Sequence, residues 1–164
     1  MKNTKKTVIA GLLIAVSVVG STLAFPVLGS KCSPVQHMVN ILSAVILGPW
    51  YGVIMAFVTS VLRVSMGLGT LMAFPGSMCG AFLAGILYKT GKKLHYALIG
   101  ELFGTSIVGG LLAYPVALFL MGNSAAVMFG YIVPFFVSSL GGTIIAAILI
   151  IALKKTKALD KLGI

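Results

Sequence analysis

Residues 25–77 read FPVLGSKCSPVQHMVNILSAVILGPWYGVIMAFVTSVLRVSMGLGTLMAFPGS, and this stretch decides how the chain is arranged. Glycine and proline interrupt its apolar runs, most sharply at Gly48-Pro49. The conspicuous polar side chains among them are Lys31, Gln36, His37, Asn40 and Arg63. Polar groups are costly within a membrane, so they usually line a binding site or a water-filled cavity. We therefore expect this stretch to contribute to the functional site.

The whole chain is strongly apolar. Of its 164 residues, 59% are hydrophobic and 9% are charged, and the mean hydropathy is +1.14. A soluble domain has about 25% charged residues. The composition therefore predicts an integral membrane protein. The length favours a single membrane domain over residues 1–164, with no room for a separate soluble catalytic module.

The net charge of +10 comes from lysines that flank the apolar runs. These lysines precede the first run, separate two later runs and follow the last one: Lys2, Lys5, Lys6, Lys89, Lys92, Lys93, Lys154, Lys155, Lys157 and Lys161. Lysines in such positions mark the cytoplasmic ends of membrane spans. Their placement argues for a topology signal and against nucleic-acid binding.

The number of crossings depends on whether residues 35–66 form one helix or two. Pro49 lacks a backbone N–H and disfavours helix at Gly48, which predicts a turn there. Two crossings place residues 89–93 on the same side as the N-terminal lysines, as the positive-inside rule requires. We predict an all-α bundle of six transmembrane helices with both termini cytoplasmic. The expected helices are approximately 7–28, 35–48, 51–66, 75–88, 95–120 and 125–153.

Several enzyme classes are excluded by their missing motifs. The chain has no G-x4-GK[ST] phosphate loop, no H-E-x-x-H zinc motif and no G-x-S-x-G elbow. Its only acidic residues are Glu101 and Asp160, so a hydrolytic carboxylate pair is not expected. Cys32 and Cys79 lack metal-ligand spacing and are interpreted as small packing residues, with a disulfide as the alternative. No cofactor or metal site is predicted.

Polar residues near the predicted outer surface are candidates for ligand binding. His37 and Asn40 are three residues apart, so they lie on neighbouring faces of one helical turn, and both donate and accept hydrogen bonds. Arg63 either snorkels to the headgroups or lines a polar pocket under residues 66–74, where Thr70 lies. We favour the pocket, because the glycine-rich loop that follows Arg63 is able to fold back over a ligand.

Glu101 is the only carboxylate expected at membrane depth. Thr105 is one turn further on the same face. Glu101 is interpreted either as a buried structural carboxylate or as a ligand contact or partner of Arg63. Tyr114 lies on nearly the opposite face, unless Pro115 or helix tilt brings it round.

Two aromatic residues of the last helix, Tyr131 and Phe135, lie near the predicted outer face. They are able to stack on a flat heterocycle, although a membrane-interface belt is the commoner reason for such rings.

Small residues recur at four-residue spacing. The series are Gly11/Ala15, Gly76/Gly80/Ala84, Gly100/Gly104 and Ser138/Gly142/Ala146. Small residues let helix backbones approach closely in lipid, so most of them are expected at helix contacts inside the bundle. Gly11 and Ala15 lie on the first helix and are equally suited to contact another protein.

With these residues placed, the chain resembles the substrate-binding (S) components of energy-coupling factor vitamin transporters, and most closely the ThiW family. The resemblance lies in FPVLGSKCSPVQHMVNILSAVILGPWYG, RVSMGLGTLMAFPGSMCGAFLAG and GELFGTSIVGGLLAYP, which cover most of residues 25–116. The K-C-x-P-V-Q-H-x-x-N and AFPGSM strings are its more specific parts.

The resemblance implies a multi-pass protein of the prokaryotic cell membrane that binds hydroxyethylthiazole, a thiamine precursor, from outside. It implies docking on a transmembrane coupling protein that carries two cytoplasmic ATPases. Related S components use Ala-x3-Ala on the first helix for docking, and here Gly11-x3-Ala15 departs at the first position.

The resemblance also implies a pocket near the outer surface. Our candidate ligand-binding residues are Lys31, His37, Asn40, Arg63, Thr70, Glu101, Tyr114 and Tyr131. Glu101 is expected deeper than the others and fits less well. A neutral thiazole alcohol needs few charges, so a phosphorylated thiazole suits Lys31 and Arg63 better.

Three other functions remain open on the sequence. The chain could be an S component for thiamine or another heterocycle. It could be a small intramembrane enzyme with Glu101 and His37 as acid and base, although their different predicted depths count against it. A solitary channel or exporter is disfavoured only by the resemblance.

Overall fold

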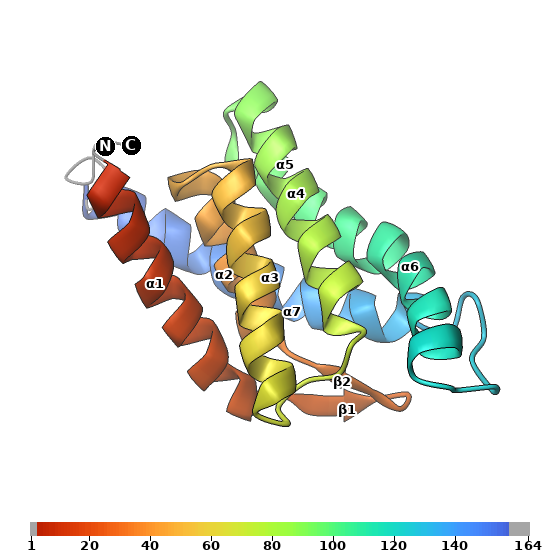
Figure 1. Ribbon diagram of the computed structural model, residues 1–164. Coiled ribbons are helices and arrows are strands. Elements are labelled where there is room, and N and C mark those ends of the chain that lie inside the picture. The colour runs from red at the N-terminus through yellow and green to blue at the C-terminus, as the bar shows by residue number, and fades with distance from the viewer. Residues whose placement is uncertain (1–2, 158–164) are drawn as a thin grey trace.

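The computed structural model describes residues 3–157 as a bundle of helices with one small β-hairpin (Figure 1). The helices are α1 (Asn3–Gly20), α2 (Pro34–Ile46), α3 (Pro49–Ser65), α4 (Ala73–Gly91), α5 (Leu94–Phe103), α6 (Gly110–Pro115) and α7 (Ile132–Lys155). A 3₁₀ turn, η1 (Ser21–Leu23), extends α1. Two π-helical segments, η2 (Gly104–Gly109) and η3 (Val116–Leu120), join α5 and α6 into one helix from Leu94 to Leu120. The hairpin consists of β1 (Phe25–Val27) and β2 (Ser30–Cys32).

The apolar helices identify a membrane protein. Among the residues described, three segments are long and apolar enough to cross a membrane: Asn3–Leu23, Leu94–Leu120 and Ile132–Lys155. The helices α2 and α3 are also apolar but shorter, with 13 and 17 residues. The predicted helical bundle is thus confirmed, whereas the prediction of six crossings rests on the lysine distribution.

The predicted break between α2 and α3 is confirmed. Gly48 has φ of 92°, a conformation that residues with a side chain rarely adopt. Pro49 then starts α3, where its missing N–H would have had no helical partner. The Lys6 ammonium lies 5.9 Å from the centre of the Tyr51 ring, so this turn and the start of α1 share one end of the bundle. Figure 1 shows the α4–α5 connection and the end of α7 toward the same end.

The prediction that the first helix runs to residue 28 is wrong, and so is the all-α prediction in this region. The helix ends at Gly20 and η1 at Leu23, and residues 25–32 form an antiparallel hairpin with Pro26 opposite Lys31. Leu28 and Gly29 both have positive φ, as a two-residue hairpin turn requires. Three-residue strands are too short to show a hydrophobic period, which is why the sequence did not reveal them.

The last helix also starts later than predicted. It begins at Ile132 instead of residue 125, and residues 121–131 form a loop. Within the loop, the Asn123 side chain accepts a hydrogen bond from the Ala125 N–H at 3.1 Å, a local turn that competes with helix. Pro134 consequently lies in the first turn of α7 and does not interrupt it. The first helix starts at Asn3, four residues before the predicted residue 7, and the fourth helix, Ala73–Gly91, is longer than the predicted 75–88. The remaining predicted bounds agree within two residues.

Glycines set the close packing of the helix from Leu94 to Leu120 against α4. A Cβ added at Gly100, Gly104 or Gly109 would come within 2.6–2.7 Å of the α4 backbone. The step from Gly104 to Gly109 is five residues, which matches the π-helical turn of η2 that contains them. The expected role of the small residues in helix packing is therefore confirmed for this pair of helices.

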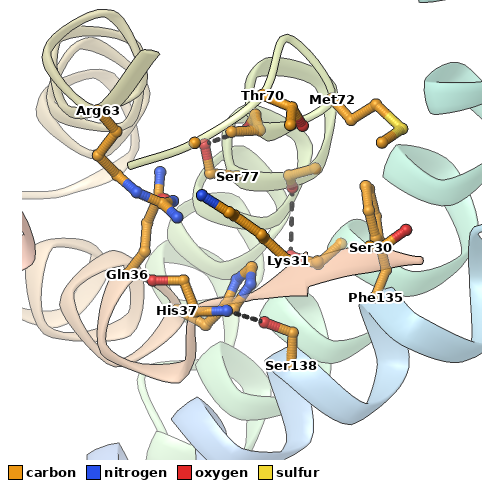
Figure 2. Close-up of a pocket in the computed structure, with 15 residues that line it drawn as sticks. Ser30, Lys31, Gln36, His37, Arg63, Thr70, Met72, Ser77, Phe135 and Ser138 are labelled. Atoms are coloured by element: carbon orange, nitrogen blue, oxygen red, sulfur yellow. Dashed lines mark hydrogen bonds between the residues drawn. The ribbon is translucent and has the colours of Figure 1, made fainter. Parts of the chain in front are cut away.

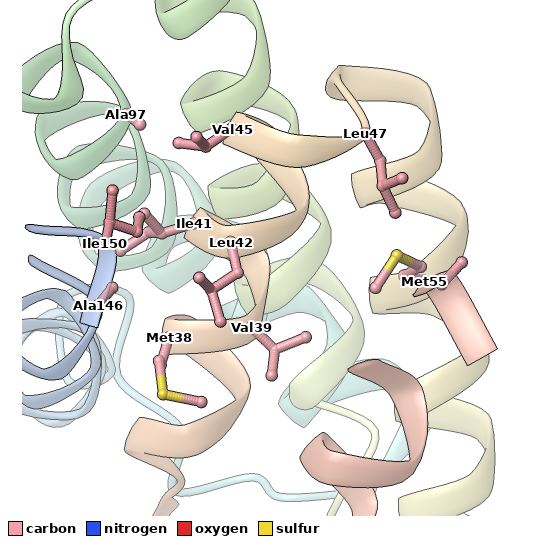
Figure 3. Close-up of a cluster of buried hydrophobic side chains, with 11 residues drawn as sticks. Met38, Val39, Ile41, Leu42, Val45, Leu47, Met55, Ala97, Ala146 and Ile150 are labelled. Atoms are coloured by element: carbon pink, nitrogen blue, oxygen red, sulfur yellow. The ribbon is translucent and has the colours of Figure 1, made fainter. Parts of the chain in front are cut away.

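The main hydrophobic core surrounds α2. Its most buried members are Ile41 of α2, Ala97 of α5, and Ala146 and Ile150 of α7 (Figure 3). Residues of α1 complete this core from the other side. Because α2 is enclosed on several sides, polar residues at its start are held inside the bundle.

Candidate functional site

A pocket lies at the end of the bundle opposite the lysine-rich connection between α4 and α5. The hairpin, the loop after α3 and the first turns of α2, α4 and α7 converge there (Figure 1). The hollow measures about 480 Å³ including its open mouth. It is lined by Ser30, Lys31, Ser33, Gln36, His37, Arg63, Gly69, Thr70, Met72, Ala73, Gly76, Ser77, Thr105, Phe135 and Ser138.

The pocket has a polar side and an apolar side. Figure 2 shows Lys31, Gln36, His37 and Arg63 gathered on one side, and Met72 and Phe135 on the other. Gly76 leaves room for the aromatic ring, since an added Cβ would lie 2.8 Å from Phe135. The arrangement suits a small molecule with a flat apolar part and a polar arm.

Arg63 is the most deeply buried cation of the pocket, with 3% of its surface exposed. Its guanidinium donates to the Gln36 side-chain oxygen, and its Nε has no hydrogen-bond partner. Gln36 in turn donates to Ser60 Oγ at 3.3 Å. Arg63 is therefore held inside the bundle by a neutral amide. It lines the pocket, as we expected, and does not extend to the lipid headgroups.

The loop after α3 folds back over Arg63. The N–H groups of Leu68 and Gly69 both donate to the Arg63 carbonyl, at 2.8 and 3.1 Å. Lys31 of β2 reaches across and donates to the Gly67 carbonyl at 3.2 Å. The hairpin and the loop are thus joined above the pocket, with Lys31 itself exposed to solvent.

Glu101 lies beneath the pocket and is fully buried. Its Oε1 accepts hydrogen bonds from His37 Nδ1 at 2.8 Å, Asn40 Nδ2 at 3.0 Å and Thr105 Oγ1 at 3.0 Å. The predicted difference in depth between Glu101 and His37 is therefore wrong. The hairpin crosses the end of the bundle, so α2 starts beneath it and its first turn already lies at the level of Glu101. A pair between Arg63 and Glu101 is not formed, and the ion-pair partner of Glu101 is His37.

Comparison with known proteins places the chain in a family. The family model described as thiamine-precursor transporter protein (ThiW) matches residues 7–156. The chain belongs to the ThiW family. A solved structure of the S component of a bacterial ECF transporter is similar, with a TM-score of 0.78 and 23% sequence identity. That match covers 94% of this chain and 98% of the other, and it shows a common fold. No curated protein matches the chain.

The family and the fold are those of a transporter component and not of an enzyme. The proximity of His37 and Glu101 in this ThiW protein removes the argument from depth against an acid–base pair. However, Glu101 lies under the pocket, where three donors share its Oε1 and its Oε2 is buried without a hydrogen-bond partner. We interpret the pair as a buried polar cluster that orients His37 toward the pocket.

The two predicted tyrosines lie outside the pocket lining. Tyr131 is buried in a small cluster with Met72, and its ring centre is 6.5 Å from that of Phe135. Tyr114 packs against the same cluster and is half-buried. The aromatic surface that faces the pocket is Phe135, one turn after Tyr131 on α7.

Several lining residues were not among the sequence candidates. Gln36 is one of the polar residues at the start of α2. Met72 directly precedes the AFPGSM string, Ser77 lies within it, and Ser138 belongs to a small-residue series. The Ser138 hydroxyl accepts a hydrogen bond from the Ser33 N–H at 2.8 Å, which ties α7 to the start of α2 (Figure 2). Met72, Ser77 and Ser138 gave no signal of a site, because apolar and small side chains of these kinds are common in helix packing.

The two cysteines are free thiols in the structure. Cys32 is buried in β2 and donates to the Pro134 carbonyl at 3.2 Å. Burial raises the pKa of the Cys32 thiol above its ordinary value, so it stays protonated at neutral pH. This supports the interpretation of Cys32 as a packing residue.

Gly11 and Ala15 lie on an exposed face of α1. A Cβ added at Gly11 would meet no atom within 4 Å, so packing of this chain does not require a small residue there. Exposed apolar residues, including Leu12 and Val16, surround them. The face is open to lipid or to another protein.

Proposed function

We propose that this ThiW protein is the substrate-binding component of an energy-coupling factor importer and that it captures hydroxyethylthiazole from outside the cell. Family membership supports a thiamine precursor as the substrate class. The likeness to an S component supports the division of labour between binding and energy supply. Under this proposal the pocket opens to the outside, and the lysine-rich end and both termini face the cytoplasm of a prokaryotic cell.

The two-sided pocket is the observation that carries the proposal. Phe135 and Met72 offer an aromatic ring and a thioether to the flat thiazole. His37, Thr70 and the pocket serines offer hydrogen bonds to the hydroxyethyl arm. Enclosure of a small ring together with one or two hydrogen bonds is sufficient for specific binding.

The remaining candidate residues have supporting roles in this proposal. Asn40 and Glu101 lie beneath the lining and fix the orientation of His37 through the shared carboxylate oxygen. Asn40 also donates to the Ser77 carbonyl at 3.1 Å and so links α2 to α4. Tyr131 supports Phe135 from behind.

Energy must come from partners, because the chain carries no phosphate-binding loop. We propose a transmembrane coupling protein with two cytoplasmic ATPases. The exposed face of α1 around Gly11 and Ala15 is the proposed docking surface. Small residues allow a partner helix to approach closely there.

Calorimetry on the purified full-length protein tests the substrate. Hydroxyethylthiazole is expected to bind saturably without ATP, and more tightly than thiamine. Binding of thiamine or another vitamin without binding of any thiazole would contradict the substrate while sparing the class. Uptake of labelled ligand is expected only in cells that also express the coupling protein and both ATPases, and uptake without them would contradict the mechanism.

A further inference from the structure

We infer that the pocket binds a ligand that carries an oxyanion, either a phosphoryl group or a carboxylate, on the arm of the heterocycle. Arg63 and Lys31 hold this group. The inference rests on the proposed function, because it specifies the chemical form of the substrate in the same pocket. It makes the neutral alcohol the weaker of the possible thiazole ligands.

The first argument is that Arg63 is a buried charge without a counter-charge. Only 3% of its surface is exposed. Burial of a charge is strongly unfavourable unless the charge is paired and hydrogen-bonded. Glu101 is the only carboxylate side chain within residues 3–157, and its ion-pair partner there is His37. Among the residues that the structure describes, Arg63 therefore has no carboxylate partner.

The second argument concerns the unused hydrogen-bonding capacity of Arg63. A guanidinium has five N–H donors in a planar fork that matches the oxygens of a phosphate or carboxylate. One donor is directed to Gln36, and Nε is buried without a partner. The side chain lines the pocket. An oxyanion at this position would supply both the missing charge and the missing acceptors.

The third argument is that a second cation shares the hollow. The Lys31 ammonium donates to one neutral acceptor, the Gly67 carbonyl. Figure 2 shows Lys31 and Arg63 on the same side of the pocket. The buried Ser33 hydroxyl, also in the lining, has no partner. Two cations and a free hydroxyl around one hollow form a complementary environment for an anion.

A purely structural role does not account for the Arg63 side chain. The loop after α3 is fastened to the Arg63 backbone carbonyl, through the N–H groups of Leu68 and Gly69. Any residue supplies that carbonyl. The bond to Gln36 does not require a charge either, because a neutral donor would satisfy the amide oxygen. What remains distinctive is a buried positive charge that faces the pocket.

The test compares three thiazoles that share one ring. They are hydroxyethylthiazole, its phosphate ester, and the acid in which a carboxylate replaces the CH₂OH group. Calorimetry uses the full-length protein in detergent at fixed ionic strength. We expect at least one oxyanion form to bind about tenfold or more tightly than the alcohol, as charge-assisted hydrogen bonds imply. The tighter of the two oxyanions identifies the chemical source of the group.

Matched variants separate recognition from folding. Arg63→Gln is expected to lower oxyanion affinity roughly 10- to 100-fold and to leave the alcohol within about threefold. Lys31→Met provides a second variant at an exposed position, should Arg63→Gln fold poorly. Lys89→Met removes an exposed lysine at the other end of the bundle and is expected to change nothing. Equal or tighter binding of the alcohol, in wild type and variants alike, overturns the inference.

A measurement with inorganic phosphate distinguishes failure of the oxyanion inference from failure of the proposed function. If no thiazole binds, the thiazole substrate is wrong, and the oxyanion site is then judged by phosphate alone. Phosphate is expected to raise the unfolding temperature of the wild type relative to chloride at equal ionic strength, and not that of Arg63→Gln. No difference between phosphate and chloride, without thiazole binding, also overturns the inference.

Discussion

Two buried side chains of opposite charge, Glu101 and Arg63, lie in this bundle, and they differ in their hydrogen-bond partners. Oε1 of Glu101 accepts hydrogen bonds from His37 and Asn40 of α2 and from Thr105 one turn further along its own helix, all at 2.8–3.0 Å. Arg63 has a neutral amide as its side-chain partner and no counter-ion within residues 3–157. The Glu101 cluster lies under the pocket, and its Oε2 has no hydrogen-bond partner, whereas Arg63 lines the pocket itself.

The contrast indicates that Glu101 supports the fold beneath the pocket and that Arg63 recognises the ligand. Three internal donors share Oε1 of Glu101 and the side chain does not line the pocket, so its removal should affect mainly folding. A guanidinium without an anion is unfavourable in the empty protein and is relieved only when an anion binds. Functional sites commonly retain such destabilising groups. The following predictions test this difference, in order of expected effect.

Replacing Glu101 by Leu should cause the largest loss of stability. It leaves His37, Asn40 and Thr105 without their common acceptor in a buried site, which costs about 3–5 kcal/mol for a broken buried pair. Thermal unfolding in detergent measures the loss. Glu101→Gln retains an acceptor of the same shape and should lose less. Equal stability of Glu101→Leu and wild type would show that the cluster is not structural.

Gly80→Ala should be the next most damaging change. An added Cβ would lie 2.2 Å from Thr105 Oγ1 and 2.7 Å from both Glu101 carboxylate oxygens. Overpacking of this kind costs typically about 1–3 kcal/mol. The matched control is Gly11→Ala, which meets no atom within 4 Å and should stay within about 0.5 kcal/mol of wild type. Similar melting temperatures for both variants would refute the packing described for the Glu101 cluster.

Arg63→Met should not destabilise the protein, in contrast to the two substitutions above. Removal of an unpaired buried charge is expected to leave the ligand-free protein as stable as wild type, or more stable by an amount on the order of 1 kcal/mol. The same variant should lose the oxyanion preference. Unfolding curves recorded with and without ligand measure both effects. A strong destabilisation of ligand-free Arg63→Met would show that Arg63 has a structural role, as Glu101 does, and is not reserved for ligand binding.

Lys31→Met should produce the smallest effect on folding. Lys31 is exposed, and the loss of its bond to Gly67 should change stability by less than about 0.5 kcal/mol. Its contribution to ligand affinity should weaken as salt rises, since exposed charges are screened beyond about 10 Å at 0.1 M. Titrations at low and high salt measure this. Identical salt dependence of wild type and Lys31→Met would exclude Lys31 from ligand attraction.

The sequence predicts the long helices well, because hydropathy and the flanking lysines act over whole segments. The break at Gly48-Pro49 is predictable because the residues that cause it are recognisable in the sequence: a proline without an N–H, and a glycine that adopts positive φ. The packing role of Gly80, Gly100 and Gly104 also follows from spacing alone.

The site is less predictable, because it depends on contacts between distant residues. The bond from Arg63 to Gln36 spans 27 residues and that from His37 to Glu101 spans 64. Neither has a local pattern. Their placement depends on the hairpin at residues 25–32, which is too short to be read from periodicity, and the wrong depth assigned to Glu101 follows from missing it.

The most direct test of the account is the identity of the molecule that copurifies with the protein. Native mass spectrometry on the wild type and on Arg63→Met would measure its mass. We predict a thiazole that bears a phosphate or carboxylate on the wild type and its loss from the variant. A bound molecule without a thiazole ring, or the same molecule retained equally by Arg63→Met, would contradict the account.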